Sequence, residues 1–272
     1  MHNLQKAKAT ICIANYKTKE FTQLCLRSIR KFTRYPYEVV VVDNDSQDES
    51  LEYLKDLGWI RLLERRPEAG EQVGGYAHGA ALDMGLADCR TEFFLSMHSD
   101  TFVRRQGWLS ELVSYFNSNE RIACVGSGKV ELTPRWRQLL KKATDLRTFK
   151  RKALKEPDPL GKHRYYNRTI CSLYRTEILR REGLAFLMDR DKGLTAGKKL
   201  YFELADRGYK TVELPPKIMG SYIYHLAHAT QAINPEEFNL RRKTIRKYNR
   251  LVDKVMGSPE IRAVLTDDSL DK

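Results

Sequence analysis

The fold of this chain is decided by Glu92-Phe93-Phe94-Leu95-Ser96-Met97-His98-Ser99-Asp100-Thr101, an apolar run that ends in a short polar cluster. The apolar part has the length and composition of a buried strand. At the carboxyl end of such a strand, an open α/β sheet binds its ligands. His98 and Asp100 would place an imidazole and a carboxylate there, and both groups are metal ligands. The stretch therefore predicts an α/β sheet with a metal and phosphate site at one edge.

Similar apolar runs recur along the first half of the chain and alternate with helical patterns. Further strands are expected at 10–14, 37–42, 60–63 and 122–125. A helix between the first two is indicated by an apolar stripe at helical spacing, formed by Phe21, Leu24, Cys25, Ser28, Ile29 and Phe32. Ser46-Gln47-Asp48-Glu49 has the form of a capping box, which predicts a helix capped by Ser46. This alternation predicts a doubly wound α/β sheet.

In the second half, strands are expected at 169–174, 211–214 and 222–224, and helices near 176–182 and 198–207. Asn234-Pro235-Glu236-Glu237 combines a capping residue, a first-turn proline and acids, so a last basic helix is expected to begin there. The tail from Ser258 is expected to be loosely held.

Length and composition limit the class of protein. With 272 residues and 42% hydrophobic content, the chain can bury a substantial core. Its longest aliphatic runs, such as Val39–Val42, are far shorter than the ~20 apolar residues of a membrane span. No signal-peptide pattern is visible at the start. Five scattered cysteines without a Cys-x-x-Cys pair indicate reduced structural thiols, so a cytoplasmic protein is expected.

The chain is strongly basic. It has 48 Lys and Arg against 35 Asp and Glu, a net charge of +13, which predicts acidic partners such as nucleotide phosphates, anionic lipid headgroups or nucleic acid. Within residues 135–155, basic residues fill nearly all positions between apolar residues at helical spacing. This segment is either a solvated basic face or a surface for an anionic membrane or acidic acceptor. Peripheral attachment at the inner face of the membrane is therefore one possibility.

Polar clusters follow two of the expected strands. Ala14-Asn15-Tyr16 and Asp43-Asn44-Asp45 both come directly after apolar runs. Since the carboxyl ends of parallel strands meet at one edge, these clusters are expected in the same crevice as His98 and Asp100. A single aspartate after a strand is usually a cap or turn residue, but several clusters in register favour a ligand site.

Four segments in this order and spacing carry a resemblance to a known family: 9–16 (ATICIANY), 38–46 (EVVVVDNDS), 79–86 (GAALDMGL) and 94–100 (FLSMHSD). They resemble GT-A glycosyltransferases of the large family 2 over roughly residues 8–130, with a looser match through Tyr174-Arg175, 204–209 and His228. The resemblance implies a GT-A fold and transfer of a sugar from a nucleoside diphosphate sugar, with UDP favoured, to an acceptor hydroxyl. It divides a single domain, 1–272, into a nucleotide-sugar-binding half (1–128), an acceptor-binding half (129–230) and a C-terminal helix and tail (231–272).

The resemblance also implies roles in donor binding. Ala14, Asn15 and Tyr16 would flank the nucleotide, and Asp43 would accept a hydrogen bond from a uracil imide. The segment 78–83 would lie along the ribose and diphosphate, and the Ser99 hydroxyl would help to orient ligands. The residues expected to bind the donor are Ala14, Asn15, Tyr16, Asp43, Asp45, His78, Asp83 and Ser99.

Asp100 corresponds to the last acid of the family's Asp-x-Asp metal motif, and His98 stands where its first acid would be. An imidazole still ligates Mn²⁺, whereas Mg²⁺ favours oxygen ligands alone, so a divalent metal with Mn favoured over Mg is expected. The family often adds a histidine near the chain's end. His225 and His228 are the candidates, and His225 is preferred because it directly follows an expected strand.

The resemblance leaves the catalytic base open. Relatives commonly carry an acidic pair about a dozen residues before a Gly-Tyr, but the places before Gly208-Tyr209 hold Ala196 and Gly197. Just upstream, Asp189 and Asp191 are alternative carboxylates for deprotonating the acceptor in an inverting displacement, with Asp191 preferred. If neither serves, a retaining mechanism or a diverged, non-catalytic protein gains weight.

Three other functions compete with glycosyl transfer. A nucleotidyltransferase would place a glycine-rich phosphate loop after the first strand, where this chain has residues 14–19 (ANYKTK). Nucleic-acid binding is suggested by charge and by Tyr165-Tyr166 among basic residues, but no such motif is present, so no nucleic-acid partner is expected. The altered motifs also fit an inactive transferase-like binding protein. The leading expectation is synthesis of a surface polysaccharide or glycolipid on a saccharide or lipid-linked acceptor.

Overall fold

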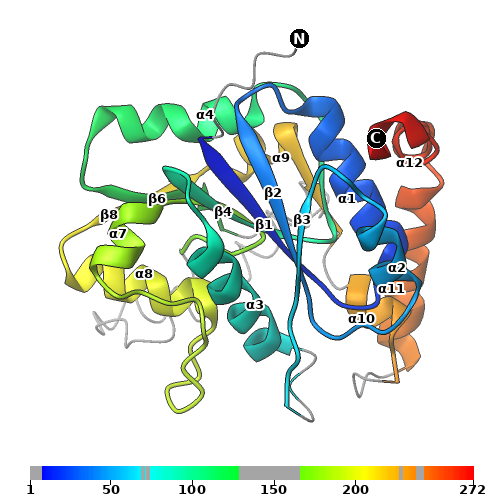
Figure 1. Ribbon diagram of the computed structural model, residues 1–272, viewed down its shortest axis with the longest axis horizontal. Coiled ribbons are helices and arrows are strands. Elements are labelled where there is room, and N and C mark those ends of the chain that lie inside the picture. The colour runs from blue at the N-terminus through cyan, green and yellow to red at the C-terminus, as the bar shows by residue number, and fades with distance from the viewer. Residues whose placement is uncertain (1–7, 69–70, 72–73, 129–165, 227–228, 237–241) are drawn as a thin grey trace, which may run out of the picture.

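The computed structural model describes residues 8–68, 71, 74–128, 166–226, 229–236 and 242–272. At its centre is a seven-stranded sheet with the order β3-β2-β1-β4-β7-β6-β8 (Figure 1). Along the chain these strands are β1 (Ala9–Asn15), β2 (Tyr37–Asp43), β3 (Arg61–Glu64), β4 (Phe93–His98), β6 (Ile122–Ser127), β7 (Cys171–Arg175) and β8 (Lys210–Leu214). Among these described strands, only β7 runs against its neighbours, so the sheet is mostly parallel. Each expected strand is confirmed to within two residues.

Helices cover both faces of the sheet, as Figure 1 shows. One face packs against α1 (Lys19–Phe32), α4 (Trp108–Ser114) and α12 (Pro259–Leu265), and the other against α3 (Gly74–Asp88), α7 (Thr176–Arg181) and α8 (Ala196–Asp206). Within β4, Phe93 and Leu95 belong to the first core and Phe94 to the second. Burial on both faces explains why the strands are continuous apolar runs rather than alternating ones.

The remaining described elements lie around this sandwich. They are α2 (Glu49–Lys55), α9 (Pro216–Tyr222), α10 (Ala229–Ile233), α11 (Arg242–Met256) and the 3-10 turns η1 (Tyr115–Ser118) and η2 (Asp268–Asp271). A second, two-stranded sheet pairs β5 (Thr101–Val103) with β9 (Ile223–His225) in antiparallel fashion. Strand β5 was not expected from the sequence, because it is short and follows β4 after a two-residue turn. This small sheet continues the chain path of β4 and places the end of β9 beside Asp100.

The helix after β2 forms, but its expected cap is wrong. Asp48, not Ser46, is the N-cap of α2, and its carboxylate accepts a hydrogen bond from Ser50 N. The Ser46 hydroxyl instead donates to Asp43 Oδ1 at 2.6 Å. The hydroxyl proton is taken by the buried Asp43 carboxylate, a strong acceptor, and the Ser46 oxygen accepts from Lys17 N at 3.0 Å, so the turn after β2 keeps Ser46 away from the helix start.

The carboxyl-terminal segment is docked, contrary to the expectation of a loosely held tail. Arg27 on α1 is 2% exposed, and it donates through Nε to Asp271 Oδ1 at 2.9 Å and through Nη2 to Asp268 Oδ1 at 2.5 Å. The Tyr53 hydroxyl donates to the same oxygen of Asp271 at 2.9 Å. Figure 1 shows α12 and the C-terminus beside α1. The tail is held because the buried Arg27 guanidinium requires carboxylate partners, which Asp268 and Asp271 supply.

The last basic helix also differs from expectation. Pro235 and Glu236 form a turn, and the described helix α11 begins at Arg242, while 237–241 lie outside the described residues. Asn234 does not cap a described helix start. Its amide Nδ2 donates to Lys17 O at 3.3 Å, which ties the end of α10 to the loop after β1.

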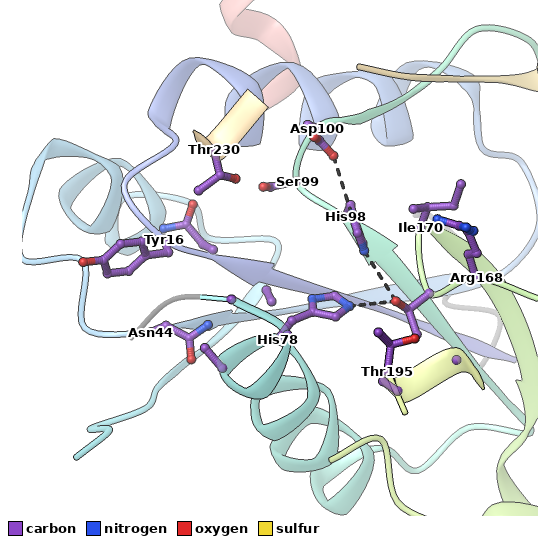
Figure 2. A pocket seen from close by; sticks show the side chains of 18 of the residues that line it. Tyr16, Asn44, His78, His98, Ser99, Asp100, Arg168, Ile170, Thr195 and Thr230 are labelled. Carbon is purple, nitrogen blue, oxygen red and sulfur yellow. Dashed lines mark hydrogen bonds and ion pairs between the residues drawn. The ribbon is translucent and has the colours of Figure 1, made fainter. Parts of the chain in front are cut away.

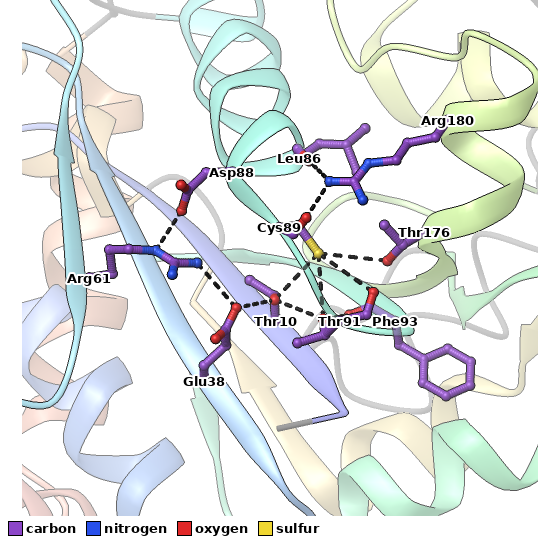
Figure 3. Close-up of polar contacts among 10 residues, drawn as sticks. All are labelled: Thr10, Glu38, Arg61, Leu86, Asp88, Cys89, Thr91, Phe93, Thr176 and Arg180. Atoms are coloured by element: carbon purple, nitrogen blue, oxygen red, sulfur yellow. Dashed lines mark hydrogen bonds and ion pairs between the residues drawn. The ribbon is translucent and has the colours of Figure 1, made fainter. Parts of the chain in front are cut away.

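A polar cluster fixes α3 at the end of the helix away from the site (Figure 3). Arg180 of α7 donates to the carbonyl oxygens of Leu86 and Cys89 at the carboxyl end of α3, where no further helical turn supplies N–H donors. On the other side, Arg61 Nε lies 2.5 Å from Asp88 Oδ2. With its carboxyl end held between β3 and α7, α3 directs its amino end toward the carboxyl edge of the sheet.

Two sequence expectations concern the cysteines and the membrane. All five cysteines are free and buried, which confirms structural thiols. Within the described residues, every helix is too short or too polar to span a bilayer. The basic segment 135–155 lies outside the described residues.

Candidate functional site

A cavity of about 380 Å³ opens at the carboxyl ends of β1 and β4 (Figure 2). Its other walls are the amino ends of α3 and α8, the segment 166–170 that leads into β7, and α10. Seven of the residues expected in the site line it: Ala14, Asn15, Tyr16, His78, His98, Ser99 and Asp100. The crevice predicted from parallel strand ends is therefore present, and three chain segments distant in sequence contribute to it.

His98, Asp100 and His225 bring three metal-ligand atoms within 4.8 Å of one another. Asp100 Oδ1 is the shared centre, 3.3 Å from His225 Nε2 and 3.8 Å from His98 Nδ1. Asp100 is only 6% exposed. Two imidazole nitrogens and one carboxylate oxygen suit Mn²⁺, Zn²⁺ or Fe²⁺, so the residues present fit a divalent metal. His228, the other candidate ligand, lies outside the described residues.

Backbone pairing explains how His225 reaches the cluster. In the small sheet, Thr101 is paired with His225, and Leu226 N donates to Asp100 O at 3.0 Å. These contacts place the end of β9 directly beside the turn after β4. The three candidate ligands, His98 at the end of β4, Asp100 in the turn after it and His225 at the end of β9, therefore depend on register in two different sheets.

The cavity holds two imidazoles whose pKa values are lowered. Burial lowers the pKa of His78 to about 4, although the nearby Asp100 carboxylate partly opposes the shift. Burial, reinforced by the neighbouring His78 ring, lowers the pKa of His98 well below its ordinary value. The two rings meet edge to face with centroids 4.6 Å apart. Both rings are therefore neutral at pH 7, the state in which an imidazole nitrogen binds a metal.

Asp43 is held inside the rim rather than exposed in the cavity. It is 1% exposed, and its carboxylate accepts from Asn15 Nδ2 at 2.7 Å, Ser46 Oγ at 2.6 Å and Ser46 N at 2.9 Å. Asn15 Oδ1 accepts in turn from the Thr22 hydroxyl at 2.7 Å. Asp43 and Asp45 border a separate hollow of about 390 Å³ beside β3. In the structure, Asp43 connects the ends of β1 and β2 through these hydrogen bonds. Its hydrogen bond to the uracil of a nucleotide stays a prediction.

Asp83 does not lie along the cavity, contrary to expectation. Its carboxylate accepts from Phe186 N at 2.5 Å and Leu187 N at 2.8 Å, so it anchors that loop on α3. Burial raises the pKa of this carboxyl group. Within the expected segment 78–83, His78 is the residue that lines the cavity. Asp83 comes more than one helical turn later, and its side chain points to a different side of α3.

The expected base residues are not brought to the cavity. Asp189 and Leu194 close a small hairpin, and Asp189 Oδ1 accepts from Lys192 N at 2.9 Å, which lowers the pKa of Asp189. Asp191 is exposed at the hairpin tip. Neither is among the described residues that line the cavity.

Ala196 and Gly197, where the family resemblance leads us to expect an acidic pair, do line the cavity at the start of α8. Their position in the cavity is the one expected for an acidic pair, but neither side chain carries a carboxylate. A Cβ on Gly197 would lie 2.6 Å from Asn167 O, so α8 packs against backbone there and leaves no space for a larger residue.

Sequence reasoning missed several cavity residues. Arg168 and Thr169 line it because β7 runs antiparallel to β4, with His98 N donating to Ile170 O at 3.2 Å. Thr195, Thr230 and Gln231 contribute from the α8 and α10 ends. No local pattern marks these residues, because their place depends on which strand pairs with β4.

The strand order, the reversed β7 and the cavity at the carboxyl edge define a GT-A glycosyltransferase fold. Residues 10–183 match the family model for glycosyl transferase family 2, so the chain belongs to that family. Two solved structures share the fold. Mannosyltransferase PcManGT from Pyrobaculum calidifontis, in complex with GDP-Man and Mn²⁺, has a TM-score of 0.54 at 16% identity, over 98% of this chain and 81% of that one. S. aureus TarS 1–349 has a TM-score of 0.51 at 15% identity, over 96% and 73%.

A curated relative is also similar in sequence. It is an uncharacterized glycosyltransferase of Haemophilus influenzae, 23% identical over 127 residues. The match covers 47% of this chain and 38% of the relative, so the chain spans less than half the length of that protein.

Proposed function

We propose that this protein transfers a sugar from a nucleoside diphosphate sugar to an acceptor hydroxyl, with a divalent metal. The observation that carries the proposal is the convergence of His98, Asp100 and His225 in a family 2 fold, at a place where His98 and Asp100 line the cavity. A metal ion bound there supplies positive charge against the negative charge that develops on the departing diphosphate. The Mn²⁺ and GDP-Man of PcManGT support both a metal and a nucleotide-sugar donor. Mn²⁺ is favoured over Mg²⁺, because two of the three donors are imidazoles.

The chain's own residues orient the donor. Ala14, Asn15 and Tyr16 form the wall at the end of β1, where the nucleotide is proposed to lie. Asn15 is held on both sides of its amide, with Nδ2 bonded to Asp43 and Oδ1 bonded to Thr22, so this wall is rigid. UDP is the proposed nucleotide, supported by the resemblance around Asp43 and by the hollow next to Asp43 and Asp45.

The identity of the catalytic base stays a prediction. We propose that Asp191, or else Asp189, deprotonates the acceptor hydroxyl and that the anomeric centre is inverted. The hairpin from 189 to 194 ends one residue before the cavity residue Thr195, although neither of its carboxylates lines the cavity. Replacement of Asp191 by Asn would abolish transfer while donor hydrolysis by water continues. Asp189→Asn, next to it on the same hairpin, is the matched comparison.

The proposed biological role is synthesis of a surface polysaccharide or glycolipid, and the basic segment 135–155 is proposed to attach the protein to an anionic membrane. Sedimentation with phosphatidylserine vesicles tests the attachment. Binding should be lost as salt is raised, because exposed charges are screened. Binding that does not change with ionic strength would rule out this attachment.

Hydrolysis of UDP- and GDP-sugars, measured with and without Mn²⁺, tests the function itself. We expect Mn²⁺-dependent release of nucleoside diphosphate and a rise in melting temperature with UDP and Mn²⁺. Ala196 and Gly197 at the place of the acidic pair favour one alternative, an inactive transferase-like binding protein. That alternative predicts a nucleotide-induced thermal shift without hydrolysis of any donor.

A further inference from the structure

A single hydroxyl lies between two imidazoles of the cavity. Thr169 Oγ1 is 3.0 Å from His78 Nε2 and 3.4 Å from His98 Nε2. The dashed lines from His78 and His98 in Figure 2 mark these two contacts. A hydroxyl has one proton and two lone pairs, so it donates to one ring and accepts from the other. The direction of this chain is set by whichever ring carries its proton on Nε2.

The other nitrogen of His98 faces the candidate metal ligands. His98 Nδ1 is 3.8 Å from Asp100 Oδ1, and that oxygen is 3.3 Å from His225 Nε2. An imidazole nitrogen that binds a metal carries no proton, so ligation through Nδ1 leaves the His98 proton on Nε2. That N–H then donates to Thr169 Oγ1, and the threonine proton is left for His78 Nε2.

We propose that Thr169 is a positioning residue whose hydroxyl holds His98 in the Nε2–H tautomer and so presents Nδ1 to the metal. The inference rests on the metal-dependent function proposed above. In metalloproteins a ligating histidine donates its second N–H to a carboxylate, a backbone carbonyl or a water, and that partner orients the ring. In this protein Thr169, in the turn before β7, takes that place, and its own proton is donated to His78 rather than to His98.

The backbone around Thr169 is fixed well enough for this task. Ile170 O accepts from His98 N and from the Thr101 hydroxyl, both at 3.2 Å. On the other side α8 packs closely, since a Cβ on Gly197 would lie 3.5 Å from Thr169 N. Thr169 itself is 9% exposed. The hydroxyl is therefore carried by the same backbone that positions His98, as a supporting residue must be.

Mn²⁺ titration followed by electron paramagnetic resonance tests the proposal without any assay of activity. Thr169→Val keeps the branched shape and removes the hydroxyl, whereas Thr169→Ser keeps the hydroxyl. We expect Mn²⁺ affinity to fall by about 10- to 100-fold in the valine variant and to be restored in the serine variant. Thr176→Val is the matched control, because Thr176 is also buried, at 2% exposure, but contacts Cys89 Sγ, away from the cavity. It should bind Mn²⁺ as the wild type does.

The tautomers are read directly by long-range ¹H–¹⁵N correlation spectra of the histidine rings, with Zn²⁺ as a diamagnetic metal. In the wild type we expect the proton of His98 on Nε2 and that of His78 on Nδ1. A His98 proton on Nδ1 in the metal-bound protein would overturn the proposal, even if the valine variant fails to fold. Wild-type Mn²⁺ binding with equal affinity in Thr169→Val overturns this inference alone. Failure of the wild type to bind Mn²⁺ overturns the proposed metal dependence as well.

Discussion

His225 Nε2 lies 3.3 Å from Asp100 Oδ1, although His225 ends β9 and Asp100 lies in the turn after β4, far away in the sequence. The contact exists because β5 continues the path of β4 and pairs with β9, so that Thr101 stands opposite His225. The imidazole at the end of β9 thereby lies beside the carboxylate of Asp100, which lines the cavity. Loss of either group should affect metal binding more than folding.

Asp100→Asn should lower Mn²⁺-dependent donor turnover by at least about 100-fold, since a bound metal contributes several kcal/mol to the barrier. The amide keeps the shape of the side chain but removes the charge that a cation needs. Initial rates of nucleoside diphosphate release measure the effect. Asp88→Asn is the control, because Asp88 pairs with Arg61 at the other end of α3. Equal losses in both variants, with lowered melting temperatures, would mean that Asp100 has only a structural role.

Acid should destabilise the protein through His78. Its pKa is lowered from 6.5 to about 4 in the folded state, so the unfolded chain binds more protons between these values. Stability is therefore present above pH 6.5 and is lost as the pH falls toward 4. Linkage gives a loss of up to about 2 kcal/mol from this residue between pH 7 and pH 5.

Urea unfolding at these two pH values measures that loss. His78→Gln cannot take up the proton, so its free energy of unfolding should change less with pH than that of the wild type. The same pH dependence in both proteins would show that His78 is not buried as a neutral ring.

Asp83→Ala should lower the free energy of unfolding by about 1–3 kcal/mol, because the N–H groups of Phe186 and Leu187 lose a buried acceptor. Nucleotide affinity should be nearly unchanged. Asp83→Asn keeps one acceptor oxygen and should cost less stability. Chemical unfolding and UDP titration distinguish the two roles of Asp83. A stable variant with weakened nucleotide binding would restore the role that the family resemblance implies.

Asp271→Asn should destabilise the protein by about 1–3 kcal/mol, since the buried Arg27 guanidinium would lose its partly buried carboxylate partner. Asp268→Asn is the matched comparison. The Asp268 side chain is 85% exposed, so its pair with Arg27 is screened by water and should contribute less than about 1 kcal/mol. Urea unfolding of both variants tests the difference. Equal effects would show that the C-terminal segment is not held through Asp271.

The positions of the strands along the chain could be predicted because they depend on local pattern. Buried parallel strands are continuous apolar runs, and each ended within two residues of its expected place. His98 and Asp100 were identified for the same reason, since a polar cluster that directly ends such a run must lie at the carboxyl edge of the sheet. His225 was expected from its position after a strand together with the family resemblance.

Hydrogen-bond partners could not be predicted in the same way. Ser46 matched a capping box and bonds Asp43, Asp83 matched a donor-binding segment and anchors a loop, and the supposedly loose tail is held by Arg27. In each case a polar side chain had a local interpretation and found a better partner from elsewhere in the chain. The partner depends on which elements pack together, and a local pattern does not contain that information.

The sequence by itself therefore determined the α/β sheet, the edge at which the cavity opens and two of the three proposed metal ligands. Tertiary structure alone decided that β7 runs antiparallel beside β4, which brings Thr169 to the rings of His78 and His98. It also decided the β5–β9 register that places His225 against Asp100. The physical reason is range: side-chain periodicity within a strand is a local property, whereas strand pairing follows from the burial and hydrogen bonding of the whole sheet.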